Sequence, residues 1–366
     1  MAYGTINRDA SVTSWGDTSA GLYGFKNRIL NGNMSIDQRN AGASVTATNF
    51  AYTLDRWKTA TSSASKYTVQ QNAGSVTPPV GFTNYLGITS SAATSVGSTD
   101  YYFLMQLIEG FNVADLAWGT INAKPVTLSF WVRSSLTGTF GGSLENNAGN
   151  RSYPFSYTIS SANTWTQISV TITGETTGTW ITNNGNGMYV QFSLGVGSTR
   201  QTTAGAWASG DYQSVTGETQ IVATNGATFY ITGVQLEKGT TATSFDYRPY
   251  GTELALCQRY CYKFGGGSTN DAFGSGFGAG GSSYVFVPFP IAMRATPSLT
   301  LYGTASDVNV TTPGVAAAAN GTPSVIGTGI NSTALQIGSA TSITSGYGVY
   351  ARIVSSSTWI TMTAEL

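Results

Sequence analysis

The sequence contains no histidine and only two cysteines, Cys257 and Cys261. The missing imidazole excludes Ser-His-Asp and Cys-His nucleophilic sites, and it excludes zinc sites with histidine ligands. Two cysteines are too few to hold a structural zinc without other ligands. The chain also lacks a P-loop motif, which removes that route to nucleotide binding.

Charged residues are scarce as well. They make up 9% of the 366 residues, against about 25% in an ordinary soluble domain. Lys and Arg number 17 and Asp and Glu number 17, so there is no basic excess to suit nucleic acid. No apolar run reaches about 18 residues, so we expect no membrane insertion. The first residues, MAYGTINRDASVTSWG, do not have the pattern of a secretory signal. A surface with so few charged residues is expected where partner proteins cover part of the chain, or where the chain works outside the cell.

Carboxylates are the remaining candidates for catalysis. The acids in polar, turn-rich stretches are Glu109, Asp115, Glu145, Glu175, Asp211 and Glu218. A glycosidase needs two carboxyl groups about 5 to 9.5 Å apart across a sugar, which no spacing in this sequence establishes. Because carboxylates lie mostly on surfaces, we interpret these six as solvated loop acids or partners of backbone amides, and the protein as no enzyme.

Period-two alternation dominates residues 27–249. In KPVTLSFWVRSS the apolar residues Val126, Leu128, Phe130 and Val132 alternate with residues on the other face, and TWTQISVTI, GMYVQFSLGVG and ATFYITGVQLEKG repeat the pattern. Short turn clusters such as LTGTFGG and TNNGNG separate these runs. This pattern predicts antiparallel sheets that each have one buried face, and a second sheet must cover that face. We therefore predict an all-β protein built on a jelly-roll β-sandwich.

Two further segments flank the predicted sandwich. Residues 1–26 lack sustained periodicity and have Trp15 and Tyr23 as isolated anchors, which indicates an extended arm that orders on a partner. Residues 265–366 alternate again in SSYVFVPFP, YGVYARIVSSS and TWITMTAEL, which predicts a smaller C-terminal β-domain. The run FGGGSTNDAFGSGFGAGG from Phe264 has glycine spacings like a dinucleotide fingerprint, but without a helical pattern after it we predict a loop.

One stretch, RPYGTELALCQRYCYKF, is typical of a helix. Thr252 is a plausible N-cap and Glu253 lies in the first turn, so we predict a linker helix over residues 250–264. Apolar residues recur on it at spacings of three, four and three, at Leu254, Cys257, Cys261 and Phe264. An apolar stripe with this spacing packs on a partner helix. The two cysteines fit the stripe, because a free cysteine behaves as a small buried apolar residue. Two arrangements stay open: three copies meet at a trimer axis, or the helix plugs one end of its own sandwich.

Long phrases of the sequence resemble one family. NRILNGNMSIDQRNAGASV, YTLDRW, QLIEGFNVADLAWGTINAKPVTLSFWVRSSLTGTF, SYTISSANTWTQISVTITGETTGTW and FYITGVQLEKGTTATSFDYRPYGTELALCQRY are similar to bacteriophage virion proteins that form tail fibres, spikes or head fibres. The similarity runs from about Asn27 to Tyr260, with a weaker echo to about Gly303. The main domain of that family is similar to carbohydrate-binding jelly-roll modules.

The resemblance implies a surface-exposed, non-enzymatic virion part that is assembled in the host cytoplasm. It implies a homotrimer, contacts with other virion proteins through the N-terminal arm, and contacts with host surface glycans. It implies no cofactor. Because such proteins fold in a reducing compartment, the two cysteines fit this history as free thiols.

Aromatic side chains are the best candidates for glycan contact, because the C–H faces of sugars stack on flat rings while polar neighbours bind hydroxyls. The candidates in polar or glycine-rich surroundings are Trp118, Tyr153, Trp180, Trp207 and Tyr212, with Arg151, Asn146 and Asn147 as hydrogen-bonding neighbours. The alternative is packing, with Trp118 and Trp180 closing the ends of the sandwich core. For a metal, Glu237 or Asp55 are the only candidate Ca²⁺ ligands, and no dense acidic cluster supports a site.

Three functions stay open. The first is a fibre or spike on tail or capsid that binds the host surface by avidity, since linked copies multiply affinity by about 10² to 10⁴. The second is a capsid decoration or head-fibre protein with a purely structural role. The third is a polysaccharide-degrading tailspike, which the lack of a long β-helical repeat and of an obvious acidic pair disfavours.

Overall fold

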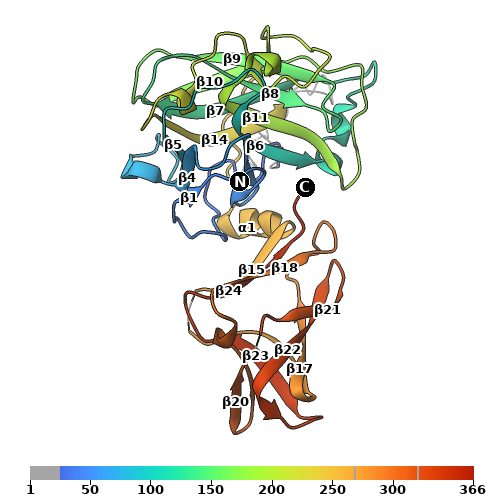
Figure 1. Ribbon diagram of the computed structural model, residues 1–366. Coiled ribbons are helices and arrows are strands. Elements are labelled where there is room, and N and C mark those ends of the chain that lie inside the picture. Colours follow the sequence, from blue (N-terminus) through green and yellow to red (C-terminus); the bar gives the residue numbers. More distant parts are fainter. Residues whose placement is uncertain (1–24, 268, 320) are drawn as a thin grey trace, which may run out of the picture.

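The computed structural model describes residues 25–267, 269–319 and 321–366. Trp15 and Tyr23 of the predicted arm lie outside these residues. Strands dominate the described part of the chain, which has one α-helix, α1 (Tyr250–Gln258). Figure 1 shows a broad upper body of strands, α1 beneath it, and a narrower body of strands below. Within the described ranges no helix is long and apolar enough to cross a membrane.

The upper body is a sandwich of two six-stranded antiparallel sheets. The first sheet, called the β14 sheet, has the strand order β1 (Val45–Thr46), β4 (Tyr67–Gln71), β5 (Leu86–Ser90), β14 (Thr228–Lys238), β7 (Val126–Ser134) and β10 (Thr166–Ile172). The β11 sheet has the order β2 (Tyr52–Leu54), β3 (Trp57–Thr61), β6 (Tyr101–Glu109), β11 (Asn186–Val196), β8 (Gly138–Glu145) and β9 (Ser152–Ile159). Strands distant in sequence are neighbours in both sheets, and the predicted jelly-roll sandwich is confirmed.

The core between the two sheets comes from the alternation in the sequence. Val126, Leu128, Phe130 and Val132 of β7 are all buried. The ring of Phe130 lies edge-on to Phe192 of β11 and to Tyr157 of β9, with centroids 5.0 and 5.1 Å apart. Full burial of one such side chain stabilises the fold by about 1.5 to 3 kcal/mol, so this face holds the sheets together.

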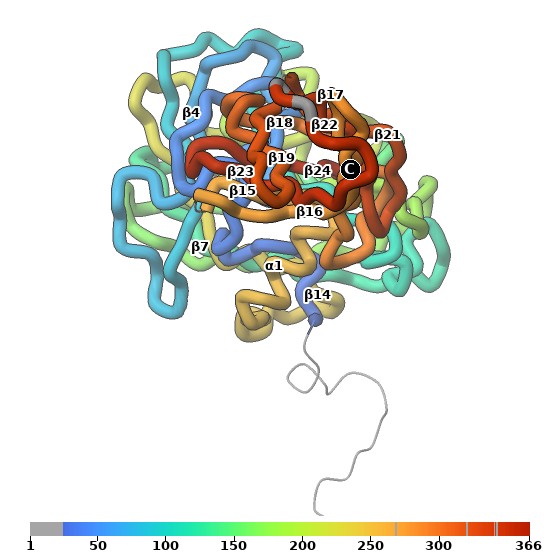
Figure 2. The backbone as a smooth tube through the Cα atoms, turned by 90° about the horizontal axis from the view of Figure 1, so that it is seen from below, coloured from blue at the N-terminus to red at the C-terminus, as the bar shows by residue number. Residues whose placement is uncertain are grey.

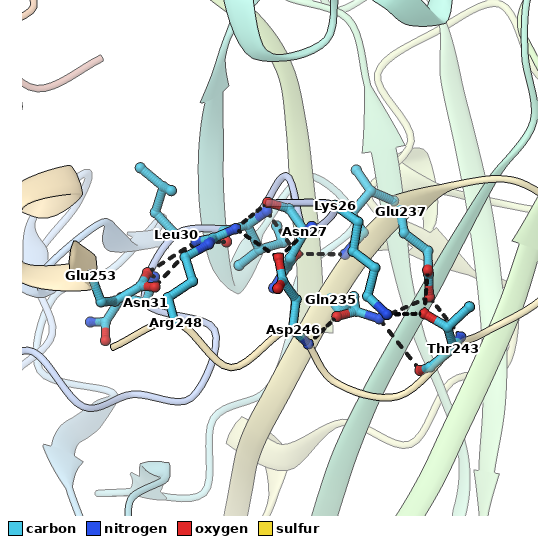
Figure 3. Close-up of polar contacts among 12 residues, drawn as sticks. Lys26, Asn27, Leu30, Asn31, Gln235, Glu237, Thr243, Asp246, Arg248 and Glu253 are labelled. Atoms are coloured by element: carbon cyan, nitrogen blue, oxygen red, sulfur yellow. Dashed lines mark hydrogen bonds and ion pairs between the residues drawn. The ribbon is translucent and has the colours of Figure 1, made fainter. Parts of the chain in front are cut away.

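The first described residues are bound tightly to β14 (Figure 3). Asn27 donates from Nδ2 to the Val234 carbonyl at 3.0 Å, and its Oδ1 accepts from the Leu236 N–H at 3.0 Å. Arg248 donates to the Asn27 carbonyl and, at 3.2 Å, to Glu253 in the first turn of α1. This network connects the start of the described chain, the last strand of the sandwich and the helix.

The lower body contains two smaller sheets. A three-stranded sheet has the order β15 (Cys261–Gly265), β24 (Trp359–Thr363) and β18 (Ser298–Tyr302). A seven-stranded sheet has the order β20 (Val315–Ala318), β19 (Val308–Thr312), β23 (Gly348–Ile353), β16 (Asp271–Gly278), β17 (Gly280–Pro288), β22 (Ser332–Ile343) and β21 (Ser324–Thr328). They share one buried cluster, separate from the sandwich core. Seen from below in Figure 2, these strands lie over the sandwich beside α1.

The predicted helix over residues 250–264 is wrong in its second half. Helix α1 begins directly after Pro249, and no side chain caps it, so Thr252 is not the N-cap. The helix ends at Gln258, and Cys261–Gly265 form strand β15, paired with β24. The aromatic residues of Cys261–Gly265 favour a strand when the edge of another strand is available for pairing. Strand β24, at the far end of the chain, provides that edge.

The four residues of the predicted seam therefore do not form one stripe. Cys257 and Cys261 are fully buried within this chain. Phe264 belongs to the C-terminal core, where its ring stacks on Phe273 with centroids 4.8 Å apart. Only Leu254 is partly exposed. Three of the four positions are covered by the chain itself and are not available to a partner helix.

The predicted glycine-rich loop is also wrong, because strand β16 occupies it. A Cβ atom on Gly276 would lie 1.7 Å from the Tyr284 carbonyl oxygen of β17, and one on Gly274 would lie 2.7 Å from the Phe286 carbonyl oxygen. Glycine allows this close approach of the two backbones. A strand in which glycine takes every second position from Gly274 to Gly278 shows no clear apolar alternation, so its sequence does not reveal it.

Candidate functional site

A cavity of about 300 Å³ opens on the outer face of the β11 sheet. Its lining comes from β6, β8 and β11, from the turn between β8 and β9, from the loop before β2, and from the segment between Arg200 and Gln213. The lining residues are Phe50, Tyr101, Phe103, Met105, Glu145, Asn147, Ala148, Gly149, Tyr189, Gln191, Arg200, Asp211 and Gln213. Its size is at the lower end of small-molecule sites.

The alternation of β6 places an aromatic wall in this cavity. Tyr102 and Leu104 point into the sandwich core, so Tyr101, Phe103 and Met105 lie on the outer face. The rings of Phe50 and Tyr101 stack with centroids 6.4 Å apart, and Phe50 is 51% exposed. The wall therefore offers an open, flat aromatic surface to a ligand.

The floor of the cavity is polar and hydrogen-bonded. Gln191 donates from Nε2 to Oε2 of Glu145 at 2.6 Å. Arg200 donates to Oδ2 of Asp211 at 2.7 Å and to Gln213 at 3.3 Å, and its guanidinium carbon lies 4.9 Å from the centroid of the Tyr101 ring. Gln213 donates to the other oxygen of Asp211. Flat rings beside fixed polar groups form a site that can recognise a ligand with both apolar faces and hydroxyl groups.

The two carboxyl groups of the floor interact. The pKa of the Glu145 carboxyl is raised to about 9, first by burial and then by the nearby Asp211 carboxylate, against the opposing effect of the hydrogen bond from Gln191. Two ionised carboxylates would place acceptors against each other with no proton between them. At neutral pH Glu145 therefore holds a proton, which removes the repulsion between its carboxyl group and that of Asp211.

Four of the predicted glycan-binding residues meet elsewhere, in an edge-to-face cluster. The Trp118 ring lies 4.7 Å from Trp180 and 5.2 Å from Trp207, and Tyr153 lies 5.3 Å from Trp207. Each indole N–H donates to a backbone carbonyl, and Trp118 and Tyr153 are buried. Trp118 belongs to the sandwich core, on which Trp180 and Trp207 pack. None of the four lines the cavity.

The other predicted neighbours are divided between the cluster and the cavity. Arg151 pairs with the buried Glu175 at 2.7 Å and does not line the cavity. Tyr212 is partly buried between the cavity residues Asp211 and Gln213 but does not itself line the cavity. Asn147 does line it, and its Oδ1 accepts from Asn186 and Tyr189.

Of the two roles expected for the six acids, solvation holds for two of them and a bond from a backbone amide holds for Glu175 and Glu218. Of the six, only Asp115 and Asp211 are exposed. Glu109, Glu175 and Glu218 are buried and paired; Glu218 accepts from the Val196 N–H and from Ser193, which is the predicted role of an acid that satisfies a backbone amide. The arginine partners of Glu109 and Glu175, Arg259 and Arg151, lie 150 and 24 residues away in sequence, so local composition does not show them.

The structure describes no cluster of three or more acidic, cysteine or histidine side chains that would suit a metal ion. The two candidate Ca²⁺ ligands have partners within the chain. Glu237 accepts from Gln235 and Thr243, and Asp55 accepts from the backbone and side chain of Gln38.

Sequence reasoning missed the aromatic wall of the cavity. Phe50, Tyr101 and Tyr189 lie in or beside strand patterns, and such a pattern does not distinguish a ligand-binding ring from a packing one. One signal was present: YYFLMQLIE of β6 is apolar on both faces, whereas a strand with one solvated face alternates. An apolar outer face must be covered by other parts of the chain or by a ligand. Here Tyr101, Phe103 and Met105 of that face line the cavity.

No protein-family model matches the chain, and no curated protein sequence matches it significantly. Among solved structures, it is similar to the enzymatically active domain of bacteriophage CBA120 tailspike protein 4, with 12% identity and a TM-score of 0.34 over 58% of this chain but only 22% of the tailspike chain. It is also similar to TmCBM61 in complex with β-1,4-galactotriose, with 10% identity and a TM-score of 0.30 over 58% of this chain and 99% of that one. The family 11 carbohydrate-binding module of Clostridium thermocellum gives 13% identity and a TM-score of 0.27, over 54% and 98% of the two chains. These similarities are too distant to carry a functional argument.

Proposed function

We propose that this chain is the glycan-binding subunit of a bacteriophage fibre or spike, exposed on the virion surface. The observation that carries the glycan-binding part is the cavity on the β11 sheet, in which the exposed face of Phe50 and the ring of Tyr101 stand beside Glu145, Gln191 and Asp211. Sugar rings present C–H faces to aromatic rings and hydroxyl groups to amides and carboxyls. The virion part rests on the resemblance of long phrases of the sequence.

A glycan array probed with the full chain tests glycan binding. We expect binding to a subset of bacterial surface glycans and its loss when Phe50 and Tyr101 are both replaced by alanine. An array on which the folded protein binds nothing would contradict the proposal.

We further infer that the chain works as a homotrimer whose copies meet through the C-terminal domain. In the seven-stranded sheet, Phe286 and Tyr350 flank Ser275 on one face, next to the touching rings of Phe277 and Tyr284. Phe286 is 55% exposed and Phe277 is 45% exposed. With Tyr347 and Tyr350, these rings expose roughly 400 Å² of apolar surface, about half of what one partner buries in a stable interface.

Charge supports other copies of the same chain as the occupant of this face. Residues 265–366 contain five charged residues: Asp271, Arg294, Asp307, Arg352 and Glu365. Arg294, Asp307 and Glu365 make contacts within the chain. A partner that meets this face must itself be apolar and almost uncharged, and the same face of another copy has that character.

We infer that the chain binds glycans without cleaving them. The carboxyl groups of Glu145 and Asp211 are each held by a side-chain amide within the chain, whereas a glycosidase needs two carboxyl groups about 5 to 9.5 Å apart that are free to act on the sugar or a water. Incubation with a bound polysaccharide, followed by reducing-end analysis, tests this inference, and release of oligosaccharides would contradict it.

A further inference from the structure

We propose that the cavity recognises a vicinal diol, that is, two free hydroxyl groups on neighbouring carbons of a sugar ring, through the ion pair of Arg200 and Asp211. Arg200 donates to one hydroxyl group, and Asp211 accepts from the other. This inference rests on the proposed glycan binding and adds the arrangement of hydroxyl groups that the sugar must carry.

The guanidinium group of Arg200 is held in place, yet one of its nitrogens is free. Nε donates to the Thr99 carbonyl at 3.1 Å, and Nη1 donates to Asp211 at 2.7 Å and to Gln213 at 3.3 Å. The remaining nitrogen, Nη2, makes no hydrogen bond to a residue that the structure describes, and it keeps two N–H groups for a ligand. Because the group is already fixed, little side-chain entropy is lost when Nη2 binds.

Asp211 provides an acceptor beside that donor. Its Oδ2 accepts from Arg200 and its Oδ1 accepts from Gln213, but each carboxylate oxygen has a second lone pair that can accept. The side chain of Asp211 is 47% exposed and that of Arg200 is 26% exposed. A ligand hydroxyl group can therefore reach both members of the pair.

The other polar groups of the floor are less accessible or already occupied. Glu145 and Gln191 are 3% and 2% exposed. The amide of Gln213 is used at both ends, because its oxygen accepts from Arg200 and its nitrogen donates to Asp211. The ion pair is therefore the part of the floor where a free donor and an exposed acceptor lie side by side.

The aromatic wall holds a sugar ring against this pair. The guanidinium carbon of Arg200 lies 4.9 Å from the centroid of the Tyr101 ring, which in turn stacks with the exposed ring of Phe50. A sugar that lies flat on the wall turns its C–H face to the rings and its hydroxyl groups outward along its edge. Because each hydroxyl group both donates and accepts, two neighbouring ones meet Nη2 and the carboxylate together. A sugar that lacks either hydroxyl group forms only one of the two hydrogen bonds.

Periodate oxidation of an array of bacterial surface polysaccharides tests the class of ligand. The reagent cleaves the carbon–carbon bond between two free neighbouring hydroxyl groups, is itself reduced to iodate, and leaves two aldehydes that borohydride then reduces to alcohols. The full chain is applied to oxidised and untreated copies of the array, together with a long β-1,3-glucan, which has no vicinal diol inside its chain. We expect oxidation to weaken binding by about tenfold or more, and we expect the β-1,3-glucan not to bind.

Two variants locate the recognition in the ion pair. R200K keeps the charge but removes the planar donor group, and D211N replaces one acceptor oxygen with a donor, so each should weaken binding to the untreated array by about tenfold or more. The pair of Arg28 and Asp115 is a matched control, because its side chains are 20% and 46% exposed and neither lines the cavity. R28K and D115N should therefore leave all affinities unchanged. Circular dichroism establishes that each variant is folded, and D211N, at the more exposed side chain, decides alone if R200K is not.

The outcomes separate this inference from the proposed function. Binding that survives oxidation, binding to the β-1,3-glucan, or unchanged affinity in the folded variants of the ion pair would overturn diol recognition and leave glycan binding intact. An equal loss in the control variants would also overturn it, because the effect would then not belong to the cavity. Binding to no polysaccharide on the untreated array would overturn the proposed function itself.

Discussion

The guanidinium carbon of Arg56 lies 3.6 Å from the centre of the Tyr260 ring, and both side chains are fully buried. Arg56 comes from the turn before β3, whereas Tyr260 follows α1, so the stack joins the sandwich to the C-terminal domain. Arg56 also donates to Glu365, and the Tyr260 hydroxyl donates to Glu109 at 2.5 Å. This buried contact fixes how the two parts of the chain meet.

Removal of Arg56 should therefore destabilise the protein. We expect Arg56→Gln to lower the free energy of unfolding by about 3 kcal/mol, because it leaves buried acceptors and part of the charge on Glu365 without a partner. Arg28→Gln, which opens an exposed pair with Asp115, should cost less than about 1 kcal/mol. Urea unfolding of both variants measures the difference, and equal losses would count against a special role for the junction.

The exposed face of Phe50 should contribute to glycan affinity. Phe50→Ala should weaken binding by about tenfold, since an aromatic contact of this kind contributes about 1 kcal/mol beyond the area that it buries. Phe111→Ala removes an equally open ring, 60% exposed, outside the cavity and should leave the affinity unchanged. Titration with any glycan that the array identifies decides the matter, and similar effects of the two variants would place the site elsewhere.

The sandwich should lose stability as the pH rises. Burial raises the pKa of Glu218 to about 7, and it raises the pKa of Asp55 to about 6. A raised pKa in the folded state contributes stability that is fully present below the ordinary value, near 4.5 for Glu, and is lost as the pH rises through the folded value. Glu218→Gln should flatten the part of the curve between about pH 4.5 and 7, a change on the order of 3 kcal/mol in the free energy of unfolding. Melting curves from pH 4 to 9 test this, and an unchanged slope in the variant would contradict it.

The tryptophan cluster should contribute to stability and not to glycan affinity. Trp180→Ala removes a ring that packs on Trp118 and Trp207 and should lower the free energy of unfolding by about 2 to 4 kcal/mol. At a temperature where the variant is folded, its glycan affinity should equal that of the parent chain. A selective loss of affinity would restore the role that the sequence predicted for these residues.

The aromatic face of the C-terminal domain should control assembly. Phe277→Ser together with Phe286→Ser should convert the proposed trimer to monomers, because each subunit loses two of its exposed rings. Phe111→Ser, on the sandwich, should leave the assembly intact. Light scattering after size exclusion gives the mass of each, and an unchanged trimer in the double variant would place the interface on another surface.

The sequence predicted what local periodicity controls. Alternation in β7 and β14 correctly indicated strands, and their number indicated a sandwich, but Phe229 to Glu237 of β14 are buried on both faces and not on one as predicted. It failed where a strand depends on a distant partner. Strand β15 has the local pattern of a continuing helix, and β16 has glycine at three of its eight positions. Both are strands only because β24, β17 and β23 lie beside them.

By itself, the sequence determined the all-β class, the free thiols and the low charge, since these follow from composition and from the two-residue period of a strand. Only the tertiary structure decided which side chains meet. Phe50, Tyr101, Glu145, Gln191 and Asp211 are brought to one cavity from widely separated segments by the register of β6, β11 and β8. Register is set by packing over the whole sheet, so no local pattern carries it.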